Sequence, residues 1–272
     1  MKKVALILLS SMFVSSVFAE ELSPKGTKIR LDLPVGSKHE ITTDMMITNF
    51  TDASLSEEVA KVNTSIKSSY EILEKSAEGV HTVKATIMAI KANTSAQGME
   101  INYDSEDPET AQGMGAMIAQ QFAPILNKPV TFKVNNLGEV VEKPEASEDN
   151  GTMILQNMID NLFMKMPEQE VSKGDTWEDT QSSGMGASMT MSFKVEEISK
   201  NEITLSYTAD SDDLKLDEEA QGEDIKLEMG GKVIFNRKTG KLVSNNLSQT
   251  MSGSSPEQGE FFTVSTLKQS TN

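Results

Sequence analysis

The chain has 272 residues, with 25 lysines and arginines against 41 aspartates and glutamates, and its formal net charge is −16 at pH 7. An acidic surface repels phosphate backbones and anionic lipid head groups, so this balance argues against nucleic-acid binding. No cysteine is present, which excludes disulfides, thiolate metal sites and a cysteine nucleophile.

The start of the chain has the pattern of a secretory signal peptide. Two lysines are followed by the apolar run Val4–Leu9, and Val17 and Ala19 are the small residues that precede a cleavage site. We expect residues 1–19 to be removed, leaving residues 20–272 as a single β-rich domain. No other apolar stretch reaches the roughly 20 residues that a transmembrane helix needs. The sequence therefore predicts an exported protein, periplasmic or extracellular, that is soluble after cleavage and has no lipid anchor.

The first half of this domain, about residues 26–142, is expected to consist mainly of strands. Residues 59–75 are ambiguous alone, because their apolar positions fit both helical and strand spacing. Alternation is clearer at residues 83–89, which follow a turn. The segment "VTFKVNNLGEVVEK", residues 130–143, reads as a hairpin with Gly138 in its turn.

The stretch "INYDSEDPE", residues 101–109, places four acidic residues in nine positions: Asp104, Glu106, Asp107 and Glu109. Asp107 precedes Pro108, which is typical of a helix N-cap followed by proline in the first turn. Glu109 would then lie where the helix dipole favours a negative charge. A metal site would need partners from elsewhere in the chain, so we prefer the structural interpretation.

Two amphipathic helices are expected between the strand regions. The first spans about residues 108–122, with Met114, Met117 and Phe122 on its apolar stripe. The second spans about residues 152–166, within a helical segment at 151–166. Its apolar face includes Leu155, Met158, Leu162 and Phe163.

The second half, about residues 170–268, contains the clearest strand pattern of the chain. Apolar and polar residues alternate through 185–196, and Met189 and Met191 lie on the apolar face. A hairpin partner follows at 203–209, a second hairpin at 232–246, and a closing strand at 261–267. The acidic run that begins at Asp210 fails as a calcium loop, because Lys215 and Gln221 occupy the positions that need glycine and glutamate.

The two halves share a plan, which predicts an internal repeat. Ile72 corresponds to Val195 when residues 62–72 are placed on residues 185–195. Gly36 corresponds to Gly174, and Gly138 to Gly240. This match is our reason for predicting that residues 59–75 form a strand.

The motifs "KGDTW", "INYDSE" and "FKVNNLGEVVE" resemble a family of exported bacterial proteins, classed as a domain of unknown function and often lipid-anchored. The resemblance covers roughly residues 26–268. It implies a β-rich envelope or secreted protein and no established activity. This chain lacks the anchoring cysteine, so the resemblance implies a soluble member.

The residue types offer little for catalysis. His39 and His81 are the only histidines, and both are expected in structural positions. Two carboxylates suffice for glycoside hydrolysis, but the chain has one tryptophan and three tyrosines to line a cleft. We expect a non-enzymatic protein without a cofactor or metal, and a hydrolase is the enzymatic alternative.

Methionine is frequent, at 17 residues. Thioethers bind Cu(I) in exported proteins, yet the methionines coincide with the predicted apolar faces, so a flexible core is the preferred interpretation.

The predicted fold is mainly β, with two related antiparallel halves forming a curved sheet or open barrel and two helices packed on one side. The lipoprotein-carrier fold of the periplasm has this general layout. The predicted function is binding of an apolar ligand such as a lipid or acyl chain, with an envelope protein as the other partner considered. The alternative is a structural or interaction module without a ligand. Predicted ligand-lining residues are Met114, Met117, Phe122, Leu155, Met158, Leu162, Phe163, Met189 and Met191.

Overall fold

The structure is a computed structural model that describes residues 26–51, 54–55, 57–96, 98–144, 159, 162–183, 187–210, 214–216, 226–255 and 259–271. The predicted signal peptide therefore lies outside the described residues. Between β4 and β5, the described residues form the 3-10 helix η1 (Pro108–Ala111) and the helix α1 (Gly115–Phe122). The strands are β1 (Lys38–Phe50), β2 (Glu58–Lys75), β3 (His81–Ala96), β4 (Met99–Asp104), β5 (Val130–Val134), β6 (Val140–Glu142), β7 (Thr176–Ser183), β8 (Ala187–Ile198), β9 (Glu202–Asp210), β10 (Leu214–Leu216), β11 (Lys226–Asn236), β12 (Leu242–Ser255) and β13 (Gly259–Thr271).

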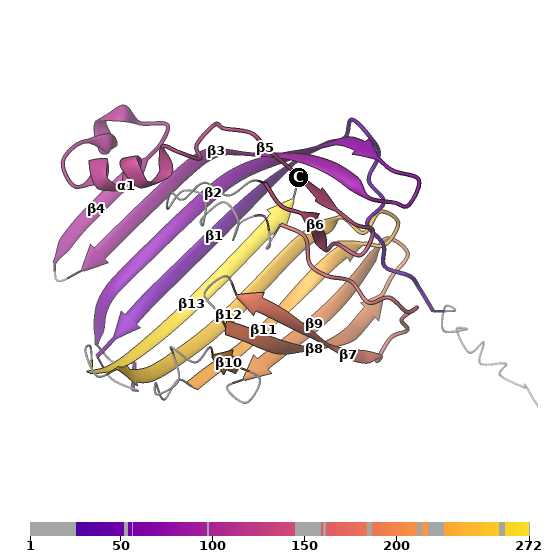
Figure 1. The fold of residues 1–272 in the computed structure, drawn as a ribbon. Coiled ribbons are helices and arrows are strands. Elements are labelled where there is room, and N and C mark those ends of the chain that lie inside the picture. The colour runs from indigo at the N-terminus through magenta and orange to yellow at the C-terminus, as the bar shows by residue number, and fades with distance from the viewer. Residues whose placement is uncertain are drawn as a thin grey trace, which may run out of the picture.

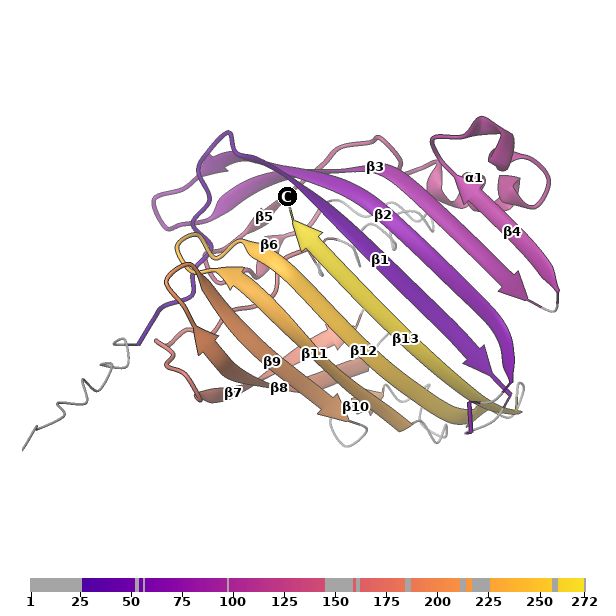
Figure 2. The same cartoon turned by 180° about the vertical axis from the view of Figure 1, so that it is seen from behind.

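These strands form one antiparallel sheet that curves but does not close. The order is β10-β8-β9-β11-β12-β13-β1-β2-β3-β5-β6, while β4 pairs with β3 and β7 pairs with β8. Strands β6 and β7 come round in front of the long central strands in Figure 1 and lie behind them in Figure 2. The prediction of a mainly β protein with a curved, open sheet is confirmed.

Corresponding positions of the two halves have the same local geometry. The N–H of Gly36 donates to the carbonyl of Ile72 at 2.7 Å, and the N–H of Gly174 donates to the carbonyl of Val195 at 2.8 Å. Both glycines have positive φ, at 81° and 91°, which residues other than glycine rarely adopt. The pairing β1-β2-β3-β5-β6 also has the same order as β7-β8-β9-β11-β12. These features fit the predicted repeat, although a common origin of the halves stays a prediction.

Most of the buried side chains lie on one face of the sheet, which we name the inner face. Paired residues in register share a face, and the inner face is the one that carries Ile72, Val83, Val195 and Leu205, all of them buried. The core is divided into two clusters. Cluster one is built around β2, β3 and β5, and cluster two around β8, β9 and β11.

The segment before β1 connects the two clusters. Ile29 is buried in cluster two, whereas Leu31 and Leu33 are buried in cluster one. Its backbone also connects the corresponding hairpin turns of the two halves. The N–H of Leu31 donates to the carbonyl of Asn136, and the N–H of Asp32 to that of Thr239, both at 2.8 Å.

The helix predictions need correction. The first predicted helix, 108–122, is divided into η1 and α1, because Gly113 between them has a φ of 57° and interrupts the helical backbone. The second, 152–166, is not helical over its described end, residues 162–166. There the N–H of Met166 donates to the carbonyl of Leu137 at 2.8 Å, so it pairs with the β5–β6 turn instead of its own helix. The earlier part lies outside the described residues, apart from Ile159, which is helical.

The acidic stretch at 101–109 has local structural partners. The side chain of Asp107 accepts a hydrogen bond from the N–H of Glu109 at 3.1 Å, as predicted for an N-cap. Asp104 lies 2.7 Å from the ammonium of Lys91 and also accepts from the N–H of Glu106. The ion pair with Lys91 holds the pKa of Asp104 below its usual range. No group of three or more acidic or histidine side chains in the described structure has a geometry that would hold a metal ion.

Candidate functional site

The inner face between the two clusters carries apolar side chains that are only half-buried. Met45 of β1 lies in register with Leu267 of β13, which lies in register with Leu247 of β12. On its other side, Met45 is in register with Thr64, and Thr64 with the buried Ala92 of cluster one. Leu247 packs against cluster two. We name Leu247, Leu267 and Met45 the apolar row, since they connect the two cores across the centre of the sheet.

The residues flanking this row explain why it stays half-buried. Thr43, Asn245 and the buried Gln269 lie on the same face one row away, and Ile47, Ser265 and Gln249 lie on the other side. Most of these side chains are polar and do not form a dry core. Among described elements, the central strands make their main contacts with neighbouring strands. The row is therefore an apolar surface between two packed regions.

Tyr207 of β9 lies at the cluster-two end of the apolar row. It is paired with Gly231, and a Cβ on Gly231 would lie 2.3 Å from the Tyr207 ring, so the ring occupies the space above the glycine. The hydroxyl donates to Asn245 Oδ1 at 2.7 Å. Burial raises the pKa of Tyr207 to about 12, which keeps the hydroxyl protonated at neutral pH. This tyrosine marks where the solid core ends and the half-buried row begins.

The predicted ligand-lining residues do not gather in one place. Leu162 and Phe163 are buried in cluster one, and Phe122 packs against it. Met191 is buried in cluster two, and Met189 packs against it.

Two further methionines of the predicted set lie at the surface, since 51% of Met114 and 74% of Met117 is exposed. Leu155 and Met158 lie outside the described residues. That these nine residues line a ligand site stays a prediction.

Both histidines belong to the packing of the first half. His39 of β1 lies in register with Tyr70, and their ring centroids are 4.9 Å apart. Trp177 and Phe193, the corresponding pair of the second half, stack at 5.2 Å. The side chain of His81 is fully buried and neither ring nitrogen has a hydrogen-bond partner in the described structure. Burial lowers the pKa of both histidines, which favours their neutral forms.

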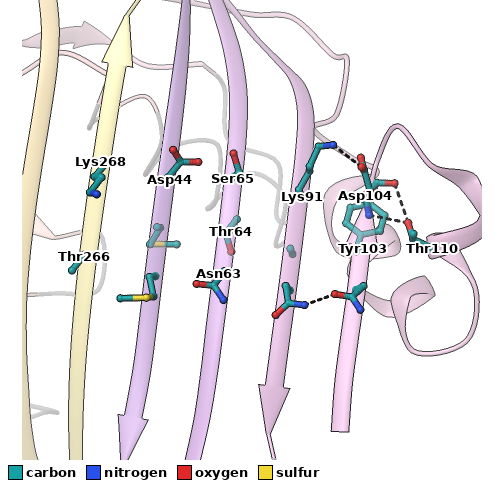
Figure 3. Close-up of a pocket in the computed structure, with 15 residues that line it drawn as sticks. Asp44, Asn63, Thr64, Ser65, Lys91, Tyr103, Asp104, Thr110, Thr266 and Lys268 are labelled. Atoms are coloured by element: carbon teal, nitrogen blue, oxygen red, sulfur yellow. Dashed lines mark hydrogen bonds and ion pairs between the residues drawn. The ribbon is translucent and has the colours of Figure 1, made fainter. Parts of the chain in front are cut away.

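The opposite face, which we name the outer face, carries an open pocket of about 530 Å³ over β13, β1, β2, β3 and β4 (Figure 3). Strand register arranges ten of its lining residues in two rows on this face. The first row is Lys268, Asp44, Ser65, Lys91 and Asp104, and the second is Thr266, Met46, Asn63, Asn93 and Asn102. The pocket is also bordered by Thr110 and, between the two rows, by Met45, Thr64, Ala92 and Tyr103. Sequence reasoning missed this pocket. Alternation identifies these positions as solvent-facing, but it does not indicate that β13 pairs with β1 and adds Lys268 and Thr266 to the consecutive strands β1 to β4.

No helix in the described part of the chain is both long and apolar enough to cross a membrane.

Residues 143–243 match a sequence family described as a family of unknown function (DUF6263). The predicted resemblance to an uncharacterised family is thereby confirmed for this part of the chain. None of the curated proteins matches the sequence.

Among solved structures, the chain is similar to one described as "Lipid-protein interactions in lipovitellin", with a TM-score of 0.58 and 13% identity. The match covers 89% of this chain and 25% of that chain, so the protein spans about a quarter of the length of lipovitellin. At this identity the likeness shows the fold alone.

Two other structures align over most of the chain with TM-scores too low to support an argument. DynF from the dynemicin pathway of Micromonospora chersina has a TM-score of 0.23 and 6% identity, covering 97% of this chain and 92% of that one. The COG4313 outer membrane channel from Pseudomonas putida F1 has a TM-score of 0.25 and 8% identity, covering 89% of this chain and 97% of that one.

Proposed function

We propose that this protein is an exported, non-enzymatic binding protein that holds an apolar ligand, such as a lipid or acyl chain, against the inner face of its sheet. The observation that carries the proposal is the apolar row, in which Leu247, Leu267 and Met45 connect two buried cores yet remain half-buried themselves. An acyl chain lying along this row would remove their remaining surface from water. Burial of apolar surface stabilises by roughly 25 cal/mol per Å².

The chemistry of the row suits a chain of variable length. Met45 has an unbranched, flexible side chain that adapts to different apolar shapes. The hydroxyls and amides beside the row offer hydrogen bonds to a polar head group. The lipovitellin structure is described as one of lipid–protein interactions in that protein, and the similar fold supports a related use of the inner face here. The export part of the proposal depends on residues 1–19.

Native mass spectrometry of the mature protein, purified from an exporting host without detergent, tests the proposal. We expect an added mass that organic extraction removes and identifies as an acyl lipid. The extracted protein should then take up a fluorescent long-chain fatty acid. A mass equal to that of the bare chain, together with no uptake of the fatty acid, would contradict the proposal and favour a structural module without a ligand.

A matched pair of variants on β13 locates the ligand. Leu267→Asn places an amide in the apolar row, and we expect fatty-acid affinity to fall about fivefold or more. Val264→Asn makes a similar change at another half-buried position of the same strand, on the outer face. Equal affinity losses in the two variants would argue against the inner face as the site.

A further inference from the structure

In one half of the outer-face pocket the polar side chains form hydrogen bonds or ion pairs with one another, and in the other half they do not. On the β3–β4 side, Lys91 and Asp104 form an ion pair at 2.7 Å, and the side-chain amide of Asn93 donates to Asn102. On the β13–β1–β2 side, the polar side chains form no hydrogen bond or ion pair within the described structure; these are Lys268, Thr266, Asp44, Ser65 and Asn63. Figure 3 shows the contrast, since its dashed lines all lie on the β3–β4 side.

The half of the pocket on β13, β1 and β2, which we name the open half, carries a positive and a negative side chain on two neighbouring strands. Asp44 and Lys268 lie directly opposite each other in register and both are exposed. Neighbouring antiparallel strands are roughly 5 Å apart, which is close to the separation of the two charges in a short amino-phosphate or amino acid. Met46, half-buried between Thr266 and Asn63, supplies an apolar floor between the charges.

Hydrogen-bond donors and acceptors lie on different strands of the open half. Lys268 and Thr266 on β13 are donors, suited to a carboxylate or phosphate. Asp44 on β1, with the Ser65 hydroxyl and the Asn63 amide oxygen on β2, can accept from an ammonium group. A ligand with only an anionic group would meet Asp44 and the −16 net charge of the chain. A ligand with only a cationic group would leave Lys268 unmatched.

We propose that the outer-face pocket binds a small zwitterion, a molecule with an ammonium group and a phosphate or carboxylate group joined by a short carbon link. The anionic group lies over β13 at Lys268, the ammonium over β1 and β2 at Asp44, and the carbon link on Met46. The pocket volume of about 530 Å³ falls in the range typical of small-molecule sites. The two rows of side chains that carry this proposal lie on the face opposite the apolar row, although Met45 also borders the pocket between them. The proposal does not depend on the proposed function.

The probe for the test is O-phosphoethanolamine, titrated into the ¹⁵N-labelled mature protein at low salt. We expect saturable NMR shifts at the backbone amides of Asp44, Ser65 and Lys268 and at the side-chain amide of Asn63. Phosphate alone and ethanolamine alone should each bind at least about threefold more weakly, because each satisfies one charge only. Absence of saturable shifts in the pocket with O-phosphoethanolamine would overturn the proposal.

Variants identify the two charges. Asp44→Asn and Lys268→Gln should each weaken binding by about three- to tenfold, and the double exchange Asp44→Lys with Lys268→Asp should restore most of it, since both charges are again present. Glu228→Gln and Lys232→Gln remove matched exposed charges from the same face of β11, outside the pocket, and should leave binding unchanged. Unchanged affinity in both pocket variants would refute the assignment.

A final comparison separates a free zwitterion from a lipid head group. Vesicles of phosphatidylethanolamine carry the same group on a membrane. Cosedimentation that depends on Asp44 and Lys268 would assign a membrane-borne ligand. Saturable binding of O-phosphoethanolamine without cosedimentation would assign a free one, and either result supports the pocket.

Discussion

The Nζ of Lys165 lies 2.9 Å from the Oδ1 of Asp179, an ion pair between the segment that precedes β7 and the β7 strand itself. The same ammonium lies 3.0 Å from Glu139 Oε1 at the β5–β6 turn. One lysine therefore joins the two ends of the open sheet. Its hydrogen bonds to Asp179 and Glu139 raise the pKa of Lys165 above its usual value.

Removing this ammonium should destabilise the protein. Only 13% of the Asp179 side chain is exposed, and its Oδ2 has no hydrogen-bond partner in the described structure, so Lys165→Met leaves a largely buried carboxylate uncompensated. We expect the free energy of unfolding to fall by about 1–2 kcal/mol in urea titrations. Lys200→Met, at an exposed turn, should change it by less than about 0.5 kcal/mol. A loss in Lys165→Met no larger than that of the control would show that the ion pair does not contribute.

The turn glycines give a graded series of alanine variants. Gly240 has a φ of 64°, and a Cβ there would lie 2.2 Å from the carbonyl oxygen of Arg30. Gly138 has a φ of 84°, and its Cβ would lie 2.5 Å from the carbonyl oxygen of Met164. Gly36 has a φ of 81°, but a Cβ there would meet no atom within 4 Å. Gly36→Ala therefore measures backbone strain alone.

We expect Gly36→Ala to cost about 1–2 kcal/mol, the penalty for a left-handed non-glycine residue. Gly138→Ala and Gly240→Ala should each lower the free energy of unfolding further, because the backbone of Met164 or Arg30 must also move. Thermal unfolding monitored by circular dichroism gives the ranking. Equal losses of unfolding free energy at all three positions would mean that the backbone at Arg30 and Met164 does not limit the space at Gly240 and Gly138.

Much of this framework is readable in the sequence because it is local. Alternation of polar and apolar residues places Phe193 and Val195 on a buried face, and the turn glycines indicate the hairpins. The long-range pairing is not readable in the same way. Nothing near residue 267 indicates that β13 will lie between β12 and β1, and the pocket lining follows from that pairing. The helix at 108–122 is predicted too long because its apolar spacing fits one continuous helix, whereas the positive φ of Gly113 interrupts the chain.

Two adjacent glycines on β11 should respond oppositely to alanine. A Cβ on Gly231 would lie 2.3 Å from the Tyr207 ring, whereas a Cβ on Gly230 would have its nearest neighbour at 3.8 Å. Gly231→Ala must displace Tyr207 and its hydrogen bond to Asn245, so we expect a loss of about 1–3 kcal/mol. Gly230→Ala should be neutral or stabilising by up to about 1 kcal/mol, because it restricts the unfolded chain.

Urea unfolding of both variants measures these effects, and near-ultraviolet circular dichroism reports whether Tyr207 has moved. A tolerated Gly231→Ala with an unchanged tyrosine signal would contradict the role assigned to the ring.

The two histidines should make the free energy of unfolding depend on pH between about 7.5 and 5.5. Burial lowers the pKa of His81 and of His39 below the usual value of 6.5, so the unfolded chain binds more protons than the folded chain as pH falls through this window. The free energy of unfolding is therefore highest above pH 6.5 and decreases as pH falls. The carboxylates with lowered pKa, such as Asp32 and Asp104, lose their stabilising effect only at more acidic pH.

His81→Leu tests which histidine dominates this dependence. Lys75 and Asp32 are the charged groups near His81, with opposite effects on its pKa, while burial is the largest influence. The leucine variant has no ring to protonate, so we expect its unfolding free energy to fall less than that of the unmodified chain between pH 7.5 and 5.5. His39→Phe, beside Tyr70, should remove a smaller part, because His39 is only half-buried. Equal pH slopes in the unmodified chain and both variants would assign the pH dependence to groups other than histidine.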